Sequence, residues 1–194
     1  MKRLLVILLL LTAFVATPVQ AQISKIAKKE AKALKRKGWV AHPAKPTIEE
    51  QLLNFYEMQY EYDEHGHPRY IYGIAQSTGL NYDSARWQAI TLAKIDLSGN
   101  IQTEVIANIN DKMVDQNEKE YTIKTITSKS EISIGTTKTI MEIYRKDSRG
   151  NLEVRIVLCC EGNEAKSAII DANTEELKKY DSGLTEKVNK ALGL

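Results

Sequence analysis

One stretch of the sequence constrains the fold more than any other, because it carries an apolar residue at every fourth position. These residues are Ala85, Ala89, Ala93, Leu97, Ile101, Val105 and Ile109. A spacing of four keeps successive side chains on nearly one face of an α-helix, which has 3.6 residues per turn. We therefore predict a long central helix over residues 83–109. Its alanines leave room for a neighbouring backbone and its larger residues need a core, so we expect it to lie across a β-sheet.

Two other segments supply the sheet. Alternation of apolar side chains predicts a strand over residues 69–76, in which Gly73 marks a close approach by the central helix. Residues 136–161 predict a β-hairpin, with Gly150 able to take a positive φ in the turn. The predicted fold class is α+β: a small antiparallel sheet (strand about 69–76 plus hairpin 136–161) packed by a long central helix 83–109 and C-terminal helices.

The second strand of the hairpin also decides how the two cysteines lie. Cys160 alternates in phase with Ile156 and Leu158, so we place it on the core face, whereas Cys159 shares the other face with Arg155. Neighbouring side chains on a strand point apart, which is poor geometry for a disulfide. We therefore predict two free thiols, of which Cys159 is the more exposed.

Local signals place the remaining elements. Thr47 and Glu50 have the spacing of a helix capping box, and the helix they begin should run to about residue 62. Residues 77–82 are predicted to form a loop, after which Asn81 or Asp83 caps the central helix. The Thr and Ser content of residues 121–134 favours a strand. Residues 163–192 are predicted to be helical and split at 181–183.

The start of the chain has the three parts of a secretory signal peptide. Lys2 and Arg3 are followed by an apolar run from Leu4 to Val15, and small residues then precede Gln22. The apolar run is shorter than the ~20 residues that a membrane span needs. We therefore predict that residues 1–21 are a cleaved signal peptide and that the protein is exported, to the periplasm or the medium.

A basic arm precedes an acidic body. Residues 22–46 contain eight Lys and Arg against one acidic residue, whereas residues 47–194 contain 17 Lys and Arg against 24 Asp and Glu. The arm should comprise a helix over 22–37, with a narrow apolar stripe, and a linker over 39–46. Residues 47–194 are predicted to form a single α+β domain. Because ordering the arm costs ~1–2 kcal/mol per residue in backbone entropy, we predict an arm that is weakly attached or mobile in the free protein and helical mainly when bound.

The arm also supplies the predicted contact residues. We expect it to bind an anionic partner in the cell envelope, either a protein or a cell-wall component, with peripheral contact to an anionic membrane as the alternative. Nucleic acid is not expected, because the body is acidic. The contact residues are predicted to be Lys25, Lys28, Lys29, Lys32, Lys35, Arg36, Lys37 and Trp39.

No constellation in the sequence predicts catalysis. His65 and His67, beside Asp63 and Glu64, could bind a divalent metal, but two His in a turn lack the ligand count of a closed site. Cys159 would need a neighbouring base to act as a nucleophile. We therefore predict no catalytic, cofactor or metal site and a protein that is not an enzyme, with an unrecognised active site as the alternative.

Three groups of residues resemble the LPP20-like domain of bacterial envelope lipoproteins. They are Tyr72-Gly73-Ile74-Ala75; Ala85-Arg86 with Ala89, Ala93 and Leu97; and Glu142 to Leu158. The resemblance covers residues 70–161, about half of the mature chain. It implies a non-catalytic envelope protein, although the chain lacks the lipobox cysteine of those lipoproteins.

Overall fold

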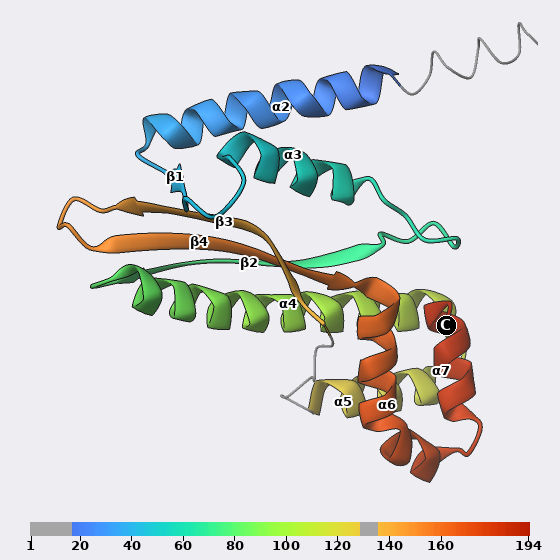
Figure 1. The fold of residues 1–194 in the computed structure, drawn as a ribbon. Coiled ribbons are helices and arrows are strands. Elements are labelled where there is room, and N and C mark those ends of the chain that lie inside the picture. The colour runs from blue at the N-terminus through green and yellow to red at the C-terminus, as the bar shows by residue number, and fades with distance from the viewer. Residues whose placement is uncertain (1–16, 129–135) are drawn as a thin grey trace, which may run out of the picture.

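The computed structural model describes residues 17–128 and 136–194 and shows an α+β protein built on a four-stranded antiparallel sheet (Figure 1). The helices are α2 Thr17–Arg36, α3 Ile48–Gln59, α4 Tyr82–Lys112, α5 Gln116–Ser128, α6 Gly162–Tyr180 and α7 Leu184–Leu192. The strands are β1 Val40–Ala41, β2 Tyr70–Gly79, β3 Lys138–Lys146 and β4 Leu152–Glu161, in the spatial order β1-β3-β4-β2. The predicted fold class is confirmed.

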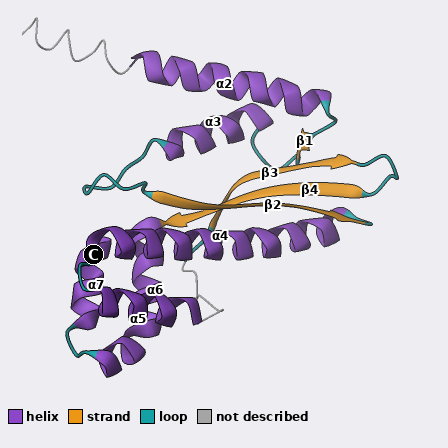
Figure 2. Cartoon of the chain, turned by 180° about the vertical axis from the view of Figure 1, so that it is seen from behind, coloured by secondary structure: helices purple, strands orange, loops and turns teal. Residues whose placement is uncertain are grey.

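The sheet has helices on both faces (Figure 2). Helices α2 and α3 cover one face, whereas α4 lies along the other and carries α5, α6 and α7 beneath its C-terminal half. One core lies between the sheet, α4 and the C-terminal helices, and a second lies between the sheet, α2 and α3. The protein is therefore layered, with α2 and α4 on opposite sides of the sheet.

Helix α4 confirms the central helix that the apolar stripe predicts. Every residue of the stripe has an exposed fraction of 0% and packs in the first core, beside Ile71, Val154 and Ile156. The Asn81 side chain caps the helix by accepting a hydrogen bond from the backbone N–H of Ser84 at 2.9 Å. The helix also runs slightly beyond the stripe at both ends, to residues 82 and 112.

The predicted close approach at Gly73 is confirmed. A Cβ atom at this position would lie 2.1 Å from the backbone oxygen of Ala93 and 2.5 Å from Cβ of Leu97, distances that real Cβ atoms do not reach. Gly79 faces α4 in the same way, since a Cβ atom there would lie 2.7 Å from the backbone nitrogen of Ala85. The absence of a side chain at these two strand positions is what lets α4 lie against the backbone of β2.

Polar side chains of α4 also reach the outer edge of β2. The backbone N–H of Ile74 donates to Oδ2 of Asp96 at 2.8 Å, and Nδ2 of Asn100 donates to the backbone oxygen of Tyr72 at 2.9 Å. An edge strand exposes such backbone groups to other chains unless something pairs with them. Asp96 and Asn100 therefore satisfy the middle of this edge from within the chain.

Several local predictions are also confirmed. The capping box is present, since the backbone N–H of Glu50 donates to the hydroxyl of Thr47 at 3.3 Å and the carboxylate of Glu50 accepts from the backbone N–H of Thr47 at 2.8 Å. Gly150 has a φ of +87° in the hairpin turn. The C-terminal helix is split between Tyr180 and Leu184.

Two predicted loops contribute to the sheet instead. The predicted linker 39–46 contains β1, which pairs with β3 so that Val40 lies opposite Tyr144. The predicted loop 77–82 contains the end of β2, where Ser77 to Gly79 pair with Val154 to Leu152 of β4. In both places the strand that pairs with the segment lies far along the chain. The local sequence therefore does not show that these segments are extended and paired.

The strand predicted over residues 121–134 is wrong for the part that the structure describes. Residues up to Ser128 belong to helix α5, and residues 129–135 lie outside the described part of the chain. The hydroxyls of Thr122 and Thr127 donate to the backbone oxygens four residues earlier, at 2.7 and 2.8 Å. Their polar groups are thereby satisfied inside a helix, which offsets the strand preference of threonine.

The predicted exposure of Cys159 is also wrong. Cys159 and Cys160 are free thiols with exposed fractions of 1% and 4%. The two side chains do lie on opposite faces of β4, but helices cover both faces of the sheet. Burial raises the pKa of both thiols, to about 12 for Cys160, which disfavours the reactive thiolate form.

The contact at Gly73 generates a prediction about stability. Gly73→Ala should lower the free energy of unfolding by about 1–3 kcal/mol, because the new methyl group overpacks the β2–α4 contact. Gly99→Ala is the matched control, since an added Cβ there meets nothing within 4 Å and α4 should gain roughly 0.5–1 kcal/mol. Urea denaturation followed by circular dichroism measures both. A Gly73→Ala variant as stable as the parent protein would contradict the contact.

Candidate functional site: the basic face of helix α2

Helix α2 is docked on the body of the protein. The residues of its apolar stripe, Ile23, Ala27, Ala31 and Leu34, are buried. They belong to the side of α2 that packs on α3, and the second core beneath includes Ile48, Leu52 and Met141. All four residues of the stripe lie after the predicted signal-peptide cleavage site, so a chain that begins at Gln22 keeps this packing surface.

The docked position corrects the prediction of a weakly attached or mobile arm, because residues of the arm are part of the second core. That prediction weighed the small area of the stripe against the entropy of ordering the helix. It did not include the apolar face of α3 and the second face of the sheet, where Ile143 and Val157 are buried in the same core. Docking of α2 therefore removes apolar surface of its neighbours from water as well as its own.

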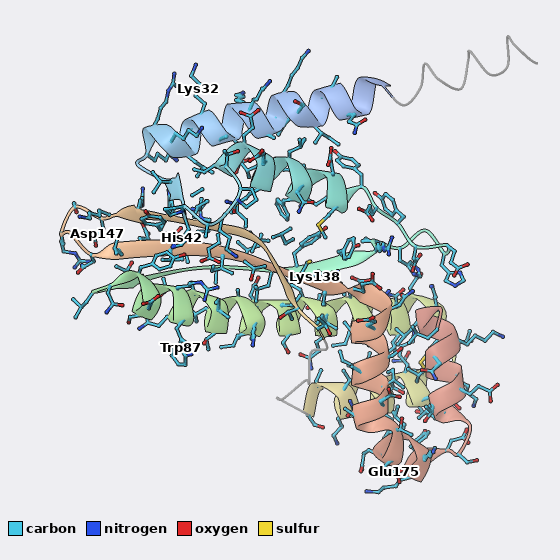
Figure 3. The ribbon with its side chains drawn as sticks, viewed as in Figure 1. Lys32, His42, Trp87, Lys138, Asp147 and Glu175 are labelled. Atoms are coloured by element: carbon cyan, nitrogen blue, oxygen red, sulfur yellow. The ribbon has the colours of Figure 1, made fainter. Side chains whose placement is uncertain are left out.

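Because the stripe faces inward, the basic side chains of α2 face outward. Figure 3 shows Lys32 pointing away from the body. Exposed Lys and Arg side chains follow one another along the helix and just past its end, and they comprise Lys25, Lys28, Lys29, Lys32, Lys35, Arg36 and Lys37. Glu30, the acidic residue of the helix, is half-buried and accepts a hydrogen bond from the hydroxyl of Tyr56. The outer face of α2 therefore carries a strong positive charge; we call these seven residues the basic face.

An open groove runs along part of the basic face. It is lined by Lys28, Ala31, Lys32, Lys35, Arg36 and, from α3, Glu49. Lys28 Nζ lies 3.9 Å from the Glu49 carboxylate, and such an exposed pair is worth at most about 1 kcal/mol. The other cations of the groove have no ion pair within the described residues, so they are free to bind an anion from outside.

Trp39 does not belong to this surface, and its assignment as a contact residue is wrong. Its exposed fraction is 2%. The guanidinium groups of Arg145 and Arg155 lie 4.8 and 4.9 Å from the centre of its ring, within the range of cation–π attraction. Arg145 also donates to the backbone oxygen of Lys37 at 3.3 Å. Trp39 therefore anchors the C-terminal end of α2 to the hairpin.

The turn that contains His65 and His67 is organised by Asp63. Oδ1 of Asp63 accepts hydrogen bonds from the backbone N–H groups of His65 and His67 at 2.9 and 2.8 Å. Nε2 of His67 lies 3.2 Å from Nζ of Lys112, which can only donate, so His67 accepts there. Across residues 17–128 and 136–194, no three His, Cys, Asp or Glu side chains are placed to hold a metal ion.

A buried carboxylate forms a second polar cluster that the sequence analysis did not identify. Glu142 of β3 is nearly inaccessible and accepts hydrogen bonds from Nε of Arg86 at 2.7 Å and from the hydroxyl of Tyr82. Nζ of Lys45 lies 3.7 Å from Oε2 of Glu142, and the ring of His42 stacks on the ring of Tyr82. Burial alone would raise the pKa of Glu142, but the hydrogen bonds from Arg86 and Tyr82 and the nearby cations outweigh it and lower the pKa.

A buried lysine forms a third cluster. Lys166 of α6 is fully buried, and its Nζ lies 3.0 Å from Oε1 of Glu104 on α4. Glu142 stands between Met141 and Ile143, and a charge inside an apolar run is the signal that could have identified it, whereas Lys166 stands among small and polar residues and carries no such signal. Each buried charge is paired with an opposite charge on α4, Glu142 with Arg86 and Lys166 with Glu104. The two clusters therefore link β3 and α6 to α4.

Comparisons with known proteins leave the family unassigned. No model of a known protein family matches the sequence, and a search of curated proteins finds no significant match. The resemblance to the LPP20-like domain therefore remains a prediction. Among residues 17–128 and 136–194, no helix has both the length and the apolar character that a membrane crossing requires.

The Glu142 cluster predicts a pH-dependent stability. Glu142→Gln should lower the free energy of unfolding near pH 7 by about 1.5–3 kcal/mol, because the hydrogen bonds from Arg86 and Tyr82 lose their charged acceptor. The pKa of Glu142 is lowered in the folded protein, so its contribution is complete above the unfolded value of about 4.5 and is lost as the pH falls through the folded value.

The difference in stability between parent and variant should therefore shrink below about pH 4.5, as measured by urea denaturation at a series of pH values. Glu175→Gln, on the exposed part of α6, is the control and should have little effect at any pH. A Glu142→Gln penalty that stays constant down to pH 3 would contradict the ion pair.

Proposed function

We propose that the protein is an exported, non-catalytic binding module of the cell envelope that holds an anionic partner against the basic face of α2. The observation that carries the proposal is the docked, inward-facing stripe of α2, which leaves all seven cations of the basic face exposed along one side of the protein. Charges placed this way attract an anionic surface and raise the rate of association with it.

The packing of α2 also distinguishes between two anionic partners. An amphipathic helix binds a bilayer by burying its apolar face among the lipids. In α2 that face is already buried against the body, so the helix would have to undock before it could insert. Contact with a membrane would then rest on charge alone. A polyanionic partner in the envelope, either an acidic protein or an acidic cell-wall polymer, therefore fits the structure better than a bilayer.

Charge neutralisation on the basic face tests the proposal. Labelled poly-L-glutamate is a suitable probe, titrated against the protein at about 50 mM salt, where exposed charges interact over more than 10 Å. The triple substitution Lys28→Gln, Lys32→Gln and Lys35→Gln should weaken binding on the order of 100-fold, at roughly 1 kcal/mol per lysine.

The matched control removes the same charge from other exposed positions, with Lys124→Gln, Lys178→Gln and Lys190→Gln. These substitutions should change the affinity only a few-fold, because they lie on the C-terminal helices. Equal weakening by the two triple variants would mean that net charge alone governs binding, and the basic face would then have no special role. Flotation with vesicles that contain anionic lipid tests the membrane alternative with the same variants.

Export is tested separately. The start of the sequence predicts that a signal peptidase removes residues 1–21. Mass spectrometry of the protein isolated from its native host should therefore find an N-terminus at or near Gln22, in the fraction outside the cytoplasm. Recovery of the chain with Met1 in the cytoplasmic fraction would refute export while leaving the anion-binding face open.

A further inference from the structure

The N-terminal half of α4 presents a bare apolar surface on the side away from the sheet. The C-terminal half of the helix is covered by α5, α6 and α7, which lie beneath it (Figure 1). Figure 3 shows Trp87 pointing away from the sheet into the open. The large apolar residues on or beside this half of the helix, with their exposed fractions, are Leu80 (90%), Trp87 (70%), Leu92 (46%) and Ile95 (63%).

Trp87 and Ile95 lie in one row along the helix, and Leu80 and Leu92 lie beside that row. Trp87, Thr91 and Ile95 are four residues apart, so they follow one another along the outward face. Asp83 and Lys94 flank the row on the same side of the helix. Both are exposed, and neither side chain makes an ion pair or hydrogen bond with the described part of the chain. Several large apolar side chains exposed close together on a helix, with charged residues at their margin, are typical of an interaction site.

We propose that two copies of the protein pair through this face, with their α4 helices antiparallel about a two-fold axis near residue 89. The row is complementary to itself in this arrangement. Trp87 of one copy lies over the small Thr91 of the other, and Leu80 meets Ile95. Asp83 meets Lys94 of the second copy, because residues on the same flank face each other in an antiparallel pair. A two-fold axis forms each contact twice.

The area of the face agrees with a weak pair. The ring of Trp87 supplies roughly 150–250 Å² when it is fully covered. With the three aliphatic side chains, each copy would bury roughly 500 Å², or about 1,000 Å² for the pair, which lies near the lower limit for specific interfaces. The pair is therefore a concentration-dependent dimer and not an obligate one. Formation of the dimer does not depend on anion binding, because α2 lies on the opposite side of the sheet from α4 (Figure 2).

Sedimentation velocity of the mature protein over roughly 1–300 µM tests the pairing. We expect a monomer at low concentration and a dimer at high concentration. Trp87→Lys should raise the dissociation constant at least ~30-fold, as expected for a central aromatic residue. Val114→Lys is the matched control, since Val114 is 96% exposed but lies away from the row, and it should leave the dimer intact.

A charge swap tests the antiparallel register. Asp83→Lys alone and Lys94→Asp alone each place like charges opposite one another, and each should weaken the dimer several-fold at low salt. The double variant restores opposite charges and should recover the affinity of the parent protein. A monomer at every concentration would overturn the proposal, as would a dimer that Trp87→Lys leaves intact. A double variant no tighter than the single variants would overturn the antiparallel arrangement.

Discussion

The fold depends on the close contact between the backbone of β2 at Gly73 and helix α4 at Ala93 and Leu97. A side chain at Gly73 would overlap backbone and Cβ atoms of the helix, so the contact is possible only because the strand has a glycine there. The contact sets the distance of α4 from the sheet, and that distance lets the stripe fill the first core and lets Asp96 and Asn100 reach the edge of β2. With α4 occupying one face, the other face is left for α2 and α3.

What the sequence predicted well is what local patterns determine. The stripe of α4, the hairpin turn at Gly150 and the capping box at Thr47 each rest on residues close together in the chain. The failures share a different cause. Cys159 is buried, β1 is a strand and α2 is docked only because elements distant in the sequence cover or pair with them. The strand predicted in place of helix α5 is wrong for another reason. The prediction rested on the strand propensity of threonine, whereas the hydroxyls of Thr122 and Thr127 donate hydrogen bonds to backbone oxygens within the helix. For the candidate site, the basic residues of α2 are exposed as a contact surface requires, whereas Trp39 is buried; whether the basic residues contact a partner stays a prediction.

The charges of the protein fall into two groups that differ in their surroundings. Glu142 and Lys166 are buried, and each is matched by an opposite charge a few ångströms away, because an unmatched charge in such a position would cost several kcal/mol. The lysines of the basic face have no such requirement. They stay in water and repel one another, and the Lys28–Glu49 pair and the helix dipole at Lys35 and Arg36 offset little of this repulsion, since exposed charges interact weakly. Their concentration on one helix is therefore better explained by a partner than by the fold.

The two proposed surfaces lie on opposite sides of the sheet, and this arrangement limits what an assembly can do. A pair formed through α4 places two sheets between its two α2 helices, so the basic faces would point away from each other. Such a pair cannot clamp one small anion between both copies. It can bridge two anionic chains, or two segments of one long polymer, and the second contact then forms at the high effective concentration set by the first. A weak dimer and a modest affinity per face would together suffice for firm, salt-sensitive attachment to a polyanionic layer, whereas a small soluble anion would gain nothing from the pairing.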